Sequence, residues 1–293
     1  MGRVAVRADC LLCPEATEAG ELCRLSFGTI VRCQDCGLVR VHPPRSPEQL
    51  MDLHRAPEYF AHPYFDARRD VSRDTLVAKQ REILERLTGG RPPAGARLLD
   101  VGCDTGALLR VARDEFGLAV LGVEVSAEAA RVAREEHGLE VQVGDLADLD
   151  LPAAGFDFIT LVDVLEHLSD PRVLLGQVHR LLRPGGKVYL ITPNHDALTH
   201  AIGLGLYRLL GARSRGLLER LYIPYHEFYF TRSTLSRLLS QAGLTVERLV
   251  GREFPLDEFG HGLLLKLGLL PVFALQALTG RRTLQEAVAV KRD

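Results

Sequence analysis

The sequence predicts an α/β fold, with a parallel sheet covered by helices on both faces and a small cysteine-bearing module in front of it. Three observations support this prediction. From residue 97 onward, apolar stretches of strand length alternate with amphipathic stretches of helical periodicity. Five of the six cysteines lie in the first 36 residues, ahead of that alternation. Two segments, 197–222 and 255–279, interrupt the alternation with helical excursions that could form lids.

Composition limits the possible partners. A chain of 293 residues can form one large domain with a small appendage. The net charge of −2 removes the long-range attraction to phosphate on which nucleic-acid binders depend, so nucleic acid is an unlikely partner. No secretion signal is recognisable at the start. The most apolar stretch, "GLLLKLGLLPVFALQAL" (262–278), is interrupted by Lys266 and Pro271. We therefore expect a cytoplasmic protein without a membrane span that can contact apolar or membrane-borne material; its oligomeric state stays open.

Proline and glycine mark the domain boundaries. "HPPRSP" (42–47) and "TGGRPPAG" (88–95) break regular structure. They suggest a module over 1–44, a linker with amino-terminal helices over 45–95, and a main domain over 96–293. In the main domain, strands are predicted at about 97–102, 119–124, 140–143, 156–162, 187–192, 244–250 and 283–292. Helices are predicted from about 106, 126 and 171, over 231–242 and, ahead of the main domain, within the amphipathic stretch 74–87.

The amino-terminal cysteines have metal-ligand spacing. Cys10, Cys13, Cys33 and Cys36 form a C-x2-C-x19-C-x2-C pattern, which is typical of a four-cysteine zinc site of the zinc-ribbon kind. Four thiolates around Zn²⁺ leave no open position, so we expect a structural metal that stabilises a segment with little core of its own. Reduced cysteines in a small core are the alternative. Cys23 has no partner in the pattern and is expected to be simply buried.

The stretch "RLLDVGCDTGALLRVA" (97–112) predicts a strand, a glycine turn and a helix. A dinucleotide fold has three glycines at G-x-G-x-x-G spacing around a pyrophosphate. Here only Gly102 and Gly106 are present, with Asp104 between them and Asp100 at the strand end. Carboxylates repel a pyrophosphate but tolerate a cation. S-adenosylmethionine, an adenosine with a positive sulfonium and no phosphate, fits this turn, and an NAD-dependent enzyme is disfavoured.

Acidic residues end the following strands too. "VLGVEVS" (120–126) places Glu124 where its two oxygens could accept the ribose hydroxyls, beside Val125. "VGDLADL" (143–149) places Asp145 where it could bind the adenine amino group, while the backbone amide of Leu146 meets a ring nitrogen. "FDFITLVDVLEHLSDP" (156–171) ends in Asp163 and Val164. These positions lie at the carboxyl ends of neighbouring parallel strands, where open α/β sheets bind ligands.

Residues 96–293 resemble the class I S-adenosylmethionine-dependent methyltransferases, in the group similar to the ubiquinone-biosynthesis methyltransferases. "LLDVGCDTG", "GVEVS", "GDLADL", "FDFITLVDVLEHLSDP", "LLRPGGKVYLITPN" and "FTRSTLSRLLSQAGL" follow in the family's order. The resemblance implies a Rossmann-like sheet of seven strands whose last strand is antiparallel. The family usually reads D-x-G-C-G-x-G in its first motif, so Asp104 departs from it. The cysteine module is similar to the zinc-binding domain ahead of certain sugar C-methyltransferases, which usually continue into a further carboxy-terminal domain that we do not expect within residues 1–293.

Single residues around the motifs have competing interpretations. Cys103 is expected to pack in the turn rather than react. Asp104 is expected to cap the helix that starts near Gly106, with some electrostatic benefit to a cation. Tyr59 and Phe60 could fold over the cofactor, although aromatic clusters more often belong to the core.

Three histidines are candidates for a general base. His226 in "YIPYHEFYFTRSTL" (222–235) comes first, because in related methyltransferases this loop faces the substrate; His195 and His167 follow. A histidine that only fixes its loop by hydrogen bonding is the alternative for each. Thr231 or Ser233 could cap the helix after that loop.

The sequence thus predicts methyl transfer to a small molecule, O- or C-directed, in natural-product, sugar or glycan biosynthesis. Arginines in 197–222 could attract an anionic acceptor, and the apolar segment 255–279 could line a pocket or form a dimer contact. One alternative is an RNA methyltransferase that grips RNA through the zinc module; low net charge disfavours it. Another is a catalytically inactive, cofactor-binding scaffold.

Overall fold

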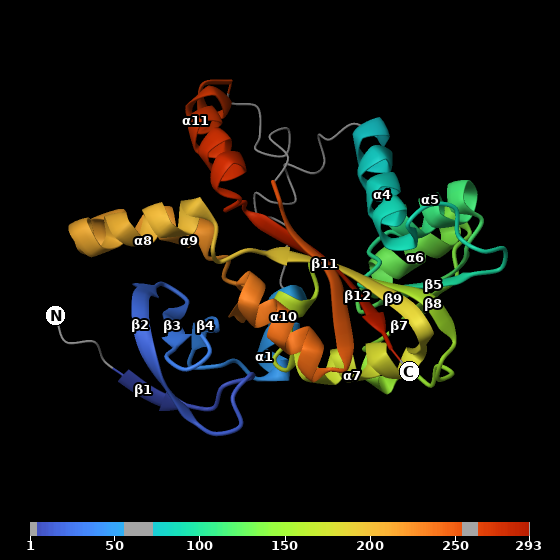
Figure 1. Cartoon of the computed structure of the whole chain (residues 1–293), viewed down its shortest axis with the longest axis horizontal. Helices are drawn as coiled ribbons and strands as arrows, with labels where there is room; N and C mark the ends of the chain where they lie inside the picture. The colour runs from blue at the N-terminus through green and yellow to red at the C-terminus, as the bar shows by residue number, and fades with distance from the viewer. Residues whose placement is uncertain (1–4, 56–72, 254–262, 293) are drawn as a thin grey trace.

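The computed structural model describes residues 5–55, 73–253 and 263–292. They form two sheets. The larger has seven strands in the order β11-β12-β9-β8-β5-β6-β7. The smaller has five, in the order β1-β2-β3-β4-β10. Figure 1 shows strands β1 to β4 of the smaller sheet in blue, near the amino-terminus.

The seven-stranded sheet is the predicted Rossmann-like sheet. Its strands are β5 Arg97–Val101, β6 Ala119–Glu124, β7 Val141–Val143, β8 Phe156–Val162, β9 Leu182–Pro193, β11 Leu244–Arg252 and β12 Leu284–Lys291. β5 to β9 pair in parallel. The last strand, β12, is antiparallel to both neighbours, β9 and β11. The expected sheet with an antiparallel last strand is therefore confirmed.

Helices cover both faces of this sheet because their apolar sides are buried against it. On one face lie α4 Arg73–Thr88, α5 Ala107–Phe116 and α6 Ala127–His137, which share a buried cluster with β5 and β7. On the other lie α7 Pro171–Leu181 and α10 Arg232–Gln241. Thr231 caps α10 in a reciprocal capping box with Thr234, which confirms one of the two predicted caps.

The cysteine module is an antiparallel sheet of β1 Ala5–Ala8, β2 Thr17–Leu25, β3 Gly28–Cys33 and β4 Val39–His42, followed by α1 Pro47–Arg55. Its fifth strand, β10 Phe228–Tyr229, comes from the main domain and pairs with β4. Leu12 and Leu38 of the module belong to the same buried cluster as α7 and α10. The module is therefore built into the main domain and shares its core.

The two helical excursions lie next to each other. The first contains α8 Leu198–Leu210, a short 3-10 turn over Gly211–Ser214, and α9 Arg215–Leu221. The second contains α11 Leu263–Thr279, which continues through Pro271. α8 contacts both α9 and α11. In the described ranges no helix is long and apolar enough to cross a membrane.

Candidate active site and metal centre

The acidic residues predicted for the cofactor meet at one edge of the sheet. β5, β6 and β7 run parallel and in register, with Val101 opposite Val123 and Glu124 opposite Val143. β8 runs beside β5 in the same direction. The segments that follow these four strands, which begin near Gly102, Val125, Gly144 and Asp163, therefore emerge at one edge.

Glu124 holds the glycine turn after β5. One of its carboxylate oxygens accepts a hydrogen bond from the backbone N–H of Asp104, and the other accepts one from Ser126, both at 2.9 Å. Gly102 and Gly106 take positive φ angles of 72° and 81°, and a Cβ on Gly106 would lie 2.3 Å from Leu139. A carboxylate has about four acceptor positions, so Glu124 keeps capacity for two further donors.

The capping interpretation of Asp104 is wrong. The N-cap of α5 is Gly106, which has no side-chain cap hydrogen bond, and Asp104 is exposed at the edge of the turn with φ 49°. Asp tolerates this left-handed conformation better than most residues do. The electrostatic interpretation of Asp104 is the one that remains.

Asp100 is buried at the end of β5. Thr160 donates a 2.6 Å hydrogen bond to its carboxylate. Burial, helped by the nearby charges of Glu124 and Asp104 and opposed by the bond from Thr160, raises the pKa of Asp100 to about 7. A cation bound at this edge would stabilise the ionised form of Asp100.

The ends of β6 and β7 carry an exposed apolar pair. Val125 is 49% exposed and Val143 is 40% exposed, which is unusual for valines at strand ends. Asp145 is exposed beside them, and one of its oxygens accepts the N–H of Ala147 at 2.9 Å. The side chain of Leu146 is buried, so only its backbone faces the edge. Apolar surface flanked by a carboxylate suits a flat heteroaromatic ring with an amino group.

Cys103 packs in the turn as predicted. Its side chain is 5% exposed, and burial raises the pKa of the thiol, the reverse of the shift that would activate a nucleophile. A Cβ on Gly122 would lie 2.6 Å from its sulfur, so the glycine in β6 leaves the room that Cys103 occupies.

Two of the three candidate histidines meet at the end of β8. His167 lies in a 3-10 turn directly after Asp163 and Val164, and its Nδ1 lies 3.1 Å from the carbonyl oxygen of Tyr225. Its ring meets that of His226 edge to face, with 4.7 Å between centroids. Val164 lies against the glycine turn, since a Cβ on Gly102 would be 3.0 Å from it. The pair is therefore adjacent to the predicted cofactor edge.

Glu166 lies behind this histidine pair and is fully buried. Thr192 donates to one of its oxygens at 2.9 Å, while the other oxygen has no hydrogen-bond partner among the described residues. Burial, together with the charge of Asp163, raises the pKa of Glu166 well above its usual value. Ligand atoms of Glu166, His167 and His226 all lie within 4.8 Å of one another, a set that can also hold a metal ion.

His195 lies elsewhere. Its Nε2 is 2.8 Å from the Tyr222 hydroxyl and its Nδ1 is 3.3 Å from the Arg32 guanidinium. Burial lowers its pKa well below the usual value, and Tyr222 and Tyr229 separate it from His226. Both ring nitrogens are thus engaged between the module and the main domain, which favours the structural interpretation of His195. Tyr59 and Phe60 lie outside the described residues.

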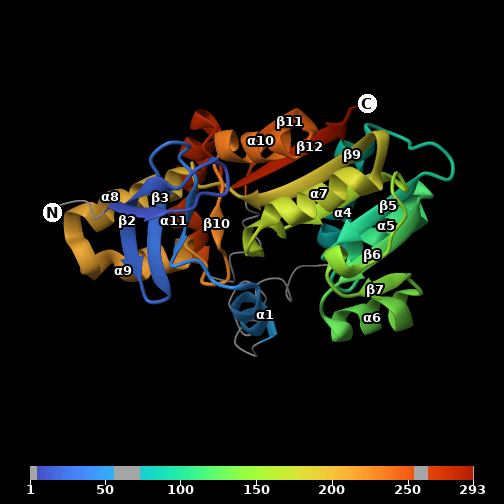
Figure 2. The same ribbon diagram turned by 90° about the horizontal axis from the view of Figure 1, so that it is seen from below.

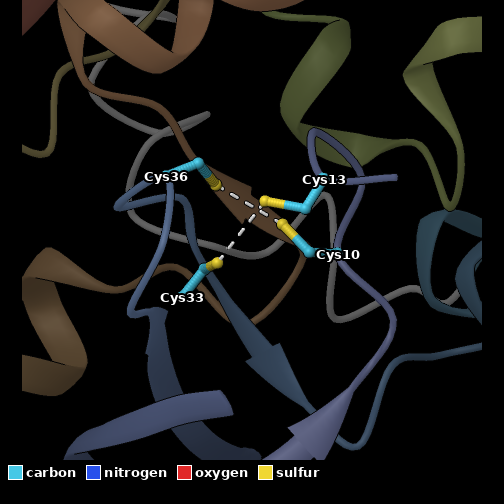
Figure 3. A group of neighbouring side chains, drawn as sticks. All are labelled: Cys10, Cys13, Cys33 and Cys36. Carbon is cyan, nitrogen blue, oxygen red and sulfur yellow. Dashed lines mark hydrogen bonds between the residues drawn. The ribbon is translucent and has the colours of Figure 1, made fainter. Parts of the chain in front are cut away.

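The four predicted metal ligands converge (Figure 3). The sulfurs of Cys10 and Cys36 are 3.4 Å apart and those of Cys13 and Cys33 are 3.9 Å apart, and all four lie within 4.8 Å of one another. A tetrahedral Zn²⁺ with Zn–S bonds of about 2.3 Å requires S–S distances of about 3.8 Å. Hydrogen bonding with Cys36 lowers the pKa of Cys10 to about 5, and the same contact raises the pKa of Cys36, so one thiol of this pair is readily deprotonated. The donor set therefore fits zinc.

Supporting contacts complete this cluster. The Thr17 hydroxyl lies 3.1 Å from the sulfur of Cys33. Gly37, directly after Cys36, has φ 79° and donates its N–H to the carbonyl of Cys33, which closes the turn of the second pair. Cys23 is fully buried in a separate cluster, with its pKa raised by burial to about 12, as expected for a cysteine outside the metal set.

The module also holds the loop that carries His226. Glu227 donates its backbone N–H to the carbonyl of Glu166 at 2.7 Å and accepts from the N–H of Val41 in β4 at 3.0 Å. Arg45 forms an ion pair with the Glu227 carboxylate and donates to the carbonyl oxygens of Pro224 and His226. Burial raises the pKa of Glu227 even though Arg45 opposes this shift.

Sequence reasoning missed three of these features. Arg45 and Glu227 are 182 positions apart, and no local pattern joins them. Nothing in the sequence around Val143 indicates that this strand residue is exposed. Glu166 is part of the motif at 156–171, but the sequence does not show that Thr192 binds one of its oxygens and leaves the other buried without a partner within the part of the chain that the structure describes.

Comparison with known proteins agrees with this geometry. A family model described as a methyltransferase domain matches residues 72–249. A ubiquinone biosynthesis O-methyltransferase of Xanthomonas axonopodis pv. citri is 33% identical over 174 residues, which cover 57% of this chain and 70% of the relative. One from Thiobacillus denitrificans is 32% identical over 172 residues, which cover 56% of this chain and 70% of the relative.

Solved structures share the fold. A possible histamine N-methyltransferase from Thermotoga maritima matches with a TM-score of 0.55 and 17% identity, over 83% of this chain and 100% of that one. Phosphoethanolamine N-methyltransferase 2 of Haemonchus contortus, in complex with S-adenosyl-L-methionine, matches with a TM-score of 0.52 and 22% identity. That match covers 74% of this chain and 53% of the other, so the chain spans about half of its length.

Proposed function

Since this chain belongs to the methyltransferase domain family and is a class I S-adenosylmethionine-dependent methyltransferase, we propose that it methylates a small acceptor, at oxygen in the first instance, with His226 as the base. The observation that carries the proposal is the meeting of His167 and His226 beside Glu166, at the end of β8. A hydroxyl acceptor benefits from a base that removes its proton, and imidazole is suited to this near neutral pH.

The cofactor would lie along the edge of the sheet. Glu124 has acceptor capacity for the ribose hydroxyls, and Asp145 has it for the adenine amino group. Val125 and Val143 would contact the adenine ring, and the backbone N–H of Leu146 would meet a ring nitrogen. Gly102, Cys103 and Gly106 form the turn, while Asp100, Asp104 and Asp163 supply negative charge toward the sulfonium and the amino group of the methionine tail. Val164 would separate the cofactor from the histidine pair.

S-adenosylmethionine supplies an electrophilic methyl group whose leaving group is a neutral thioether. The chain must align the acceptor atom with the methyl carbon and the sulfur, at about 3–3.5 Å from the methyl, and exclude water. His226 would accept the hydroxyl proton as the acceptor oxygen takes the methyl group, and the sulfur would leave as a neutral thioether. His167 would orient the His226 ring, and the free oxygen of Glu166 offers an acceptor site behind both.

We also propose that Cys10, Cys13, Cys33 and Cys36 hold a structural Zn²⁺. The four-sulfur geometry supports this, and a closed tetrahedral site leaves no position for substrate. The metal would hold the two cysteine turns, and the second of these leads into β4, which pairs with β10. The metal would therefore affect the loop that carries His226 only by stabilising the fold.

The acceptor class is the finer part of the proposal. The O-methyltransferase names of the relatives favour a hydroxyl on a small molecule, and we keep natural-product, sugar and glycan intermediates as the classes to test. Methyl-labelled cofactor is incubated with the protein and fractionated cell extract, and the labelled product is identified.

With that product's precursor as substrate, His226→Ala should lower kcat by about 10²–10³-fold while the Kd for S-adenosylmethionine stays within twofold. His195→Gln serves as a matched histidine control and should affect stability more than kcat. Parental turnover in His226→Ala would rule out this base. Labelling of RNA in place of a small molecule would overturn the acceptor class.

A further inference from the structure

Exposed apolar side chains gather on the helical excursions. Eleven large apolar side chains are more than a third exposed in the described part of the chain, and eight of them lie on α8, α9 and α11. These eight are Ile202, Leu206, Leu209, Leu210, Leu217, Leu270, Leu275 and Leu278. In both views α8, α9 and α11 lie together, away from β6, β7 and α6 (Figures 1 and 2). Such a concentration marks an interaction surface.

α8 is apolar on two opposite sides. Leu204 and Tyr207 pack on the cysteine module beside Ile30 and Val41. Ile202, Leu206, Leu209 and Leu210 follow the i, i+4, i+7, i+8 spacing of a second stripe, and Leu209 is 79% exposed. The module already covers one side of α8, so the second stripe requires another partner.

α11 repeats this arrangement. Pro271, Ala274, Leu275 and Leu278 are all exposed at i, i+3, i+4, i+7 spacing, and Leu278 is 84% exposed. α8 and α11 contact each other, and Arg281 after α11 donates to the carbonyl oxygen of Asp196 before α8. The two stripes therefore belong to one end of the molecule.

The charge around the stripes is positive. Arg208, Arg213, Arg215 and Arg220 are all exposed on and between α8 and α9. Glu219 is the one acidic residue of segment 197–222, and its carboxylate accepts the backbone N–H of Ser26 in the module. The sequence from 263 to 285 contains no acidic residue. An apolar stripe flanked by arginines complements a surface that is apolar inside and anionic outside.

We propose that α8, α9 and α11 form a membrane-docking surface that binds the interface of an anionic bilayer. The leucines of the two stripes enter the boundary of the acyl chains, and the arginines contact lipid phosphates. The helices lie in the interface and do not cross it, as α8 has 13 residues and α11 has 17. A symmetric contact with a second copy fits less well, because a two-fold axis would bring the same arginines close to one another.

The test uses the full chain and vesicles, and it reads out neither methyl transfer nor cofactor binding. The protein is sedimented with vesicles of phosphatidylcholine alone and of phosphatidylcholine with 30% phosphatidylglycerol, at about 0.1 M salt. We expect the protein to bind the anionic vesicles and to bind vesicles of phosphatidylcholine alone at least tenfold more weakly. Binding to the anionic vesicles should fall steeply in 0.5 M salt.

Variants locate the surface. Leu209→Glu and Leu278→Glu should each reduce vesicle binding at least tenfold, whereas Val173→Glu, at a 55% exposed position on α7, should bind as the parent does. Removal of Arg213 or Arg215 by alanine should weaken binding about fivefold each, and Arg131→Ala on α6 should leave it unchanged. All these side chains are exposed, so circular dichroism and cofactor titration should match the parent.

Two outcomes would overturn the proposal. One is equal binding of the parent and Leu209→Glu to anionic vesicles, or binding by neither. The other is a dimer in analytical ultracentrifugation that Leu209→Glu dissociates, without vesicle binding by the parent, which would assign the surface to a second copy. Failure of the methylation experiment would leave both results unaffected, since no acceptor is used here.

Discussion

At the carboxyl edge of the sheet, each candidate cofactor residue is placed by its own strand, whereas the loop 222–230 is placed by segments nearly two hundred residues earlier. Glu124 ends β6, Asp145 lies two residues after β7, and the two strands pair in register. His226 and Glu227 are held by Arg45 and by the pairing of β10 with β4. Local sequence is thus sufficient to place the first region, while the second depends on contacts with the module and the segment that follows it.

The difference also concerns charge. The edge of the sheet concentrates carboxylates, with Asp100 buried and its pKa raised, as expected of a site that awaits a cation. The module and loop instead compensate their buried carboxylate, Glu227, with Arg45. The second region thus contains the cation that compensates its buried carboxylate, whereas the first is expected to receive one with its ligand.

Removal of the metal should produce the largest effect, confined at first to the module and its loop. Binding of structural Zn²⁺ is worth roughly 10–16 kcal/mol in small zinc domains, and the module shares its core with α10. We expect Cys36→Ser or a strong chelator to lower the zinc content from one per chain to none and to lower the Tm by more than 10 °C. Zinc is measured by atomic spectroscopy and Tm by calorimetry.

Cys23→Ala is the control, because it removes a buried thiol outside the metal set. It should keep one zinc per chain whatever its effect on the Tm. A parent protein without zinc, or a Cys36→Ser variant with full zinc, would contradict the metal assignment.

Arg45→Ala tests whether the linker holds the loop. It leaves the Glu227 carboxylate buried without its ion-pair partner, which typically costs roughly 3–5 kcal/mol. We expect that loss in the free energy of urea unfolding, together with a lower kcat, because the carbonyls of Pro224 and His226 lose their donor. The Kd for the cofactor should not change.

Arg24→Ala is the matched change, an arginine of the same module whose pair with Glu21 is exposed. It should leave stability unchanged within error. If Arg45→Ala behaves as Arg24→Ala does, the loop is held by strand pairing alone.

Asp100 should give the edge of the sheet a pH signature of its own. Its folded-state pKa of about 7 lies above the unfolded value near 3.8, so the folded protein binds the proton more tightly. The stability that this contributes is complete below about pH 4 and is lost as the pH rises through 7, with a slope of up to about 1.4 kcal/mol per pH unit.

Asp100→Asn keeps the acceptor for Thr160 and removes this slope, so the variant should become the more stable protein above pH 7. Asp104→Asn, which changes an exposed carboxylate in the same turn, should keep most of the slope, because it removes only a minor cause of the raised pKa of Asp100. The unfolding free energies of the parent and the two variants are measured at pH 5 and pH 8. If the unfolding free energy of Asp100→Asn changes with pH as that of the parent does, the raised pKa assigned to buried Asp100 is wrong.

Sequence patterns predicted the single strands, the strand-end acids and the cysteine pairs, because each depends on periodicity or spacing within a short segment. The resemblance to the methyltransferases implied the seven-stranded sheet with its antiparallel last strand. The pairing of β10 with β4 escaped prediction, since a two-residue strand has no periodicity. Asp104 was assigned to a cap because it precedes a helix, but the backbone N–H of Asp104 is bound by Glu124 and the cap is Gly106. His195 looked like a base in the sequence and proves to be enclosed between Tyr222 and Arg32, which no single segment could reveal.

The most direct measurement is isothermal titration of S-adenosylmethionine into the parent, Glu124→Ala and His226→Ala. Glu124 would bind the ribose and already holds the glycine turn, so its loss should weaken binding by about a hundredfold. Asp145→Ala should have a smaller effect, and Glu128→Ala, which removes an exposed carboxylate nearby on α6, none. His226→Ala should bind as the parent does. Equal affinity of the parent and Glu124→Ala would contradict the assignment of the cofactor to the strand-end carboxylates.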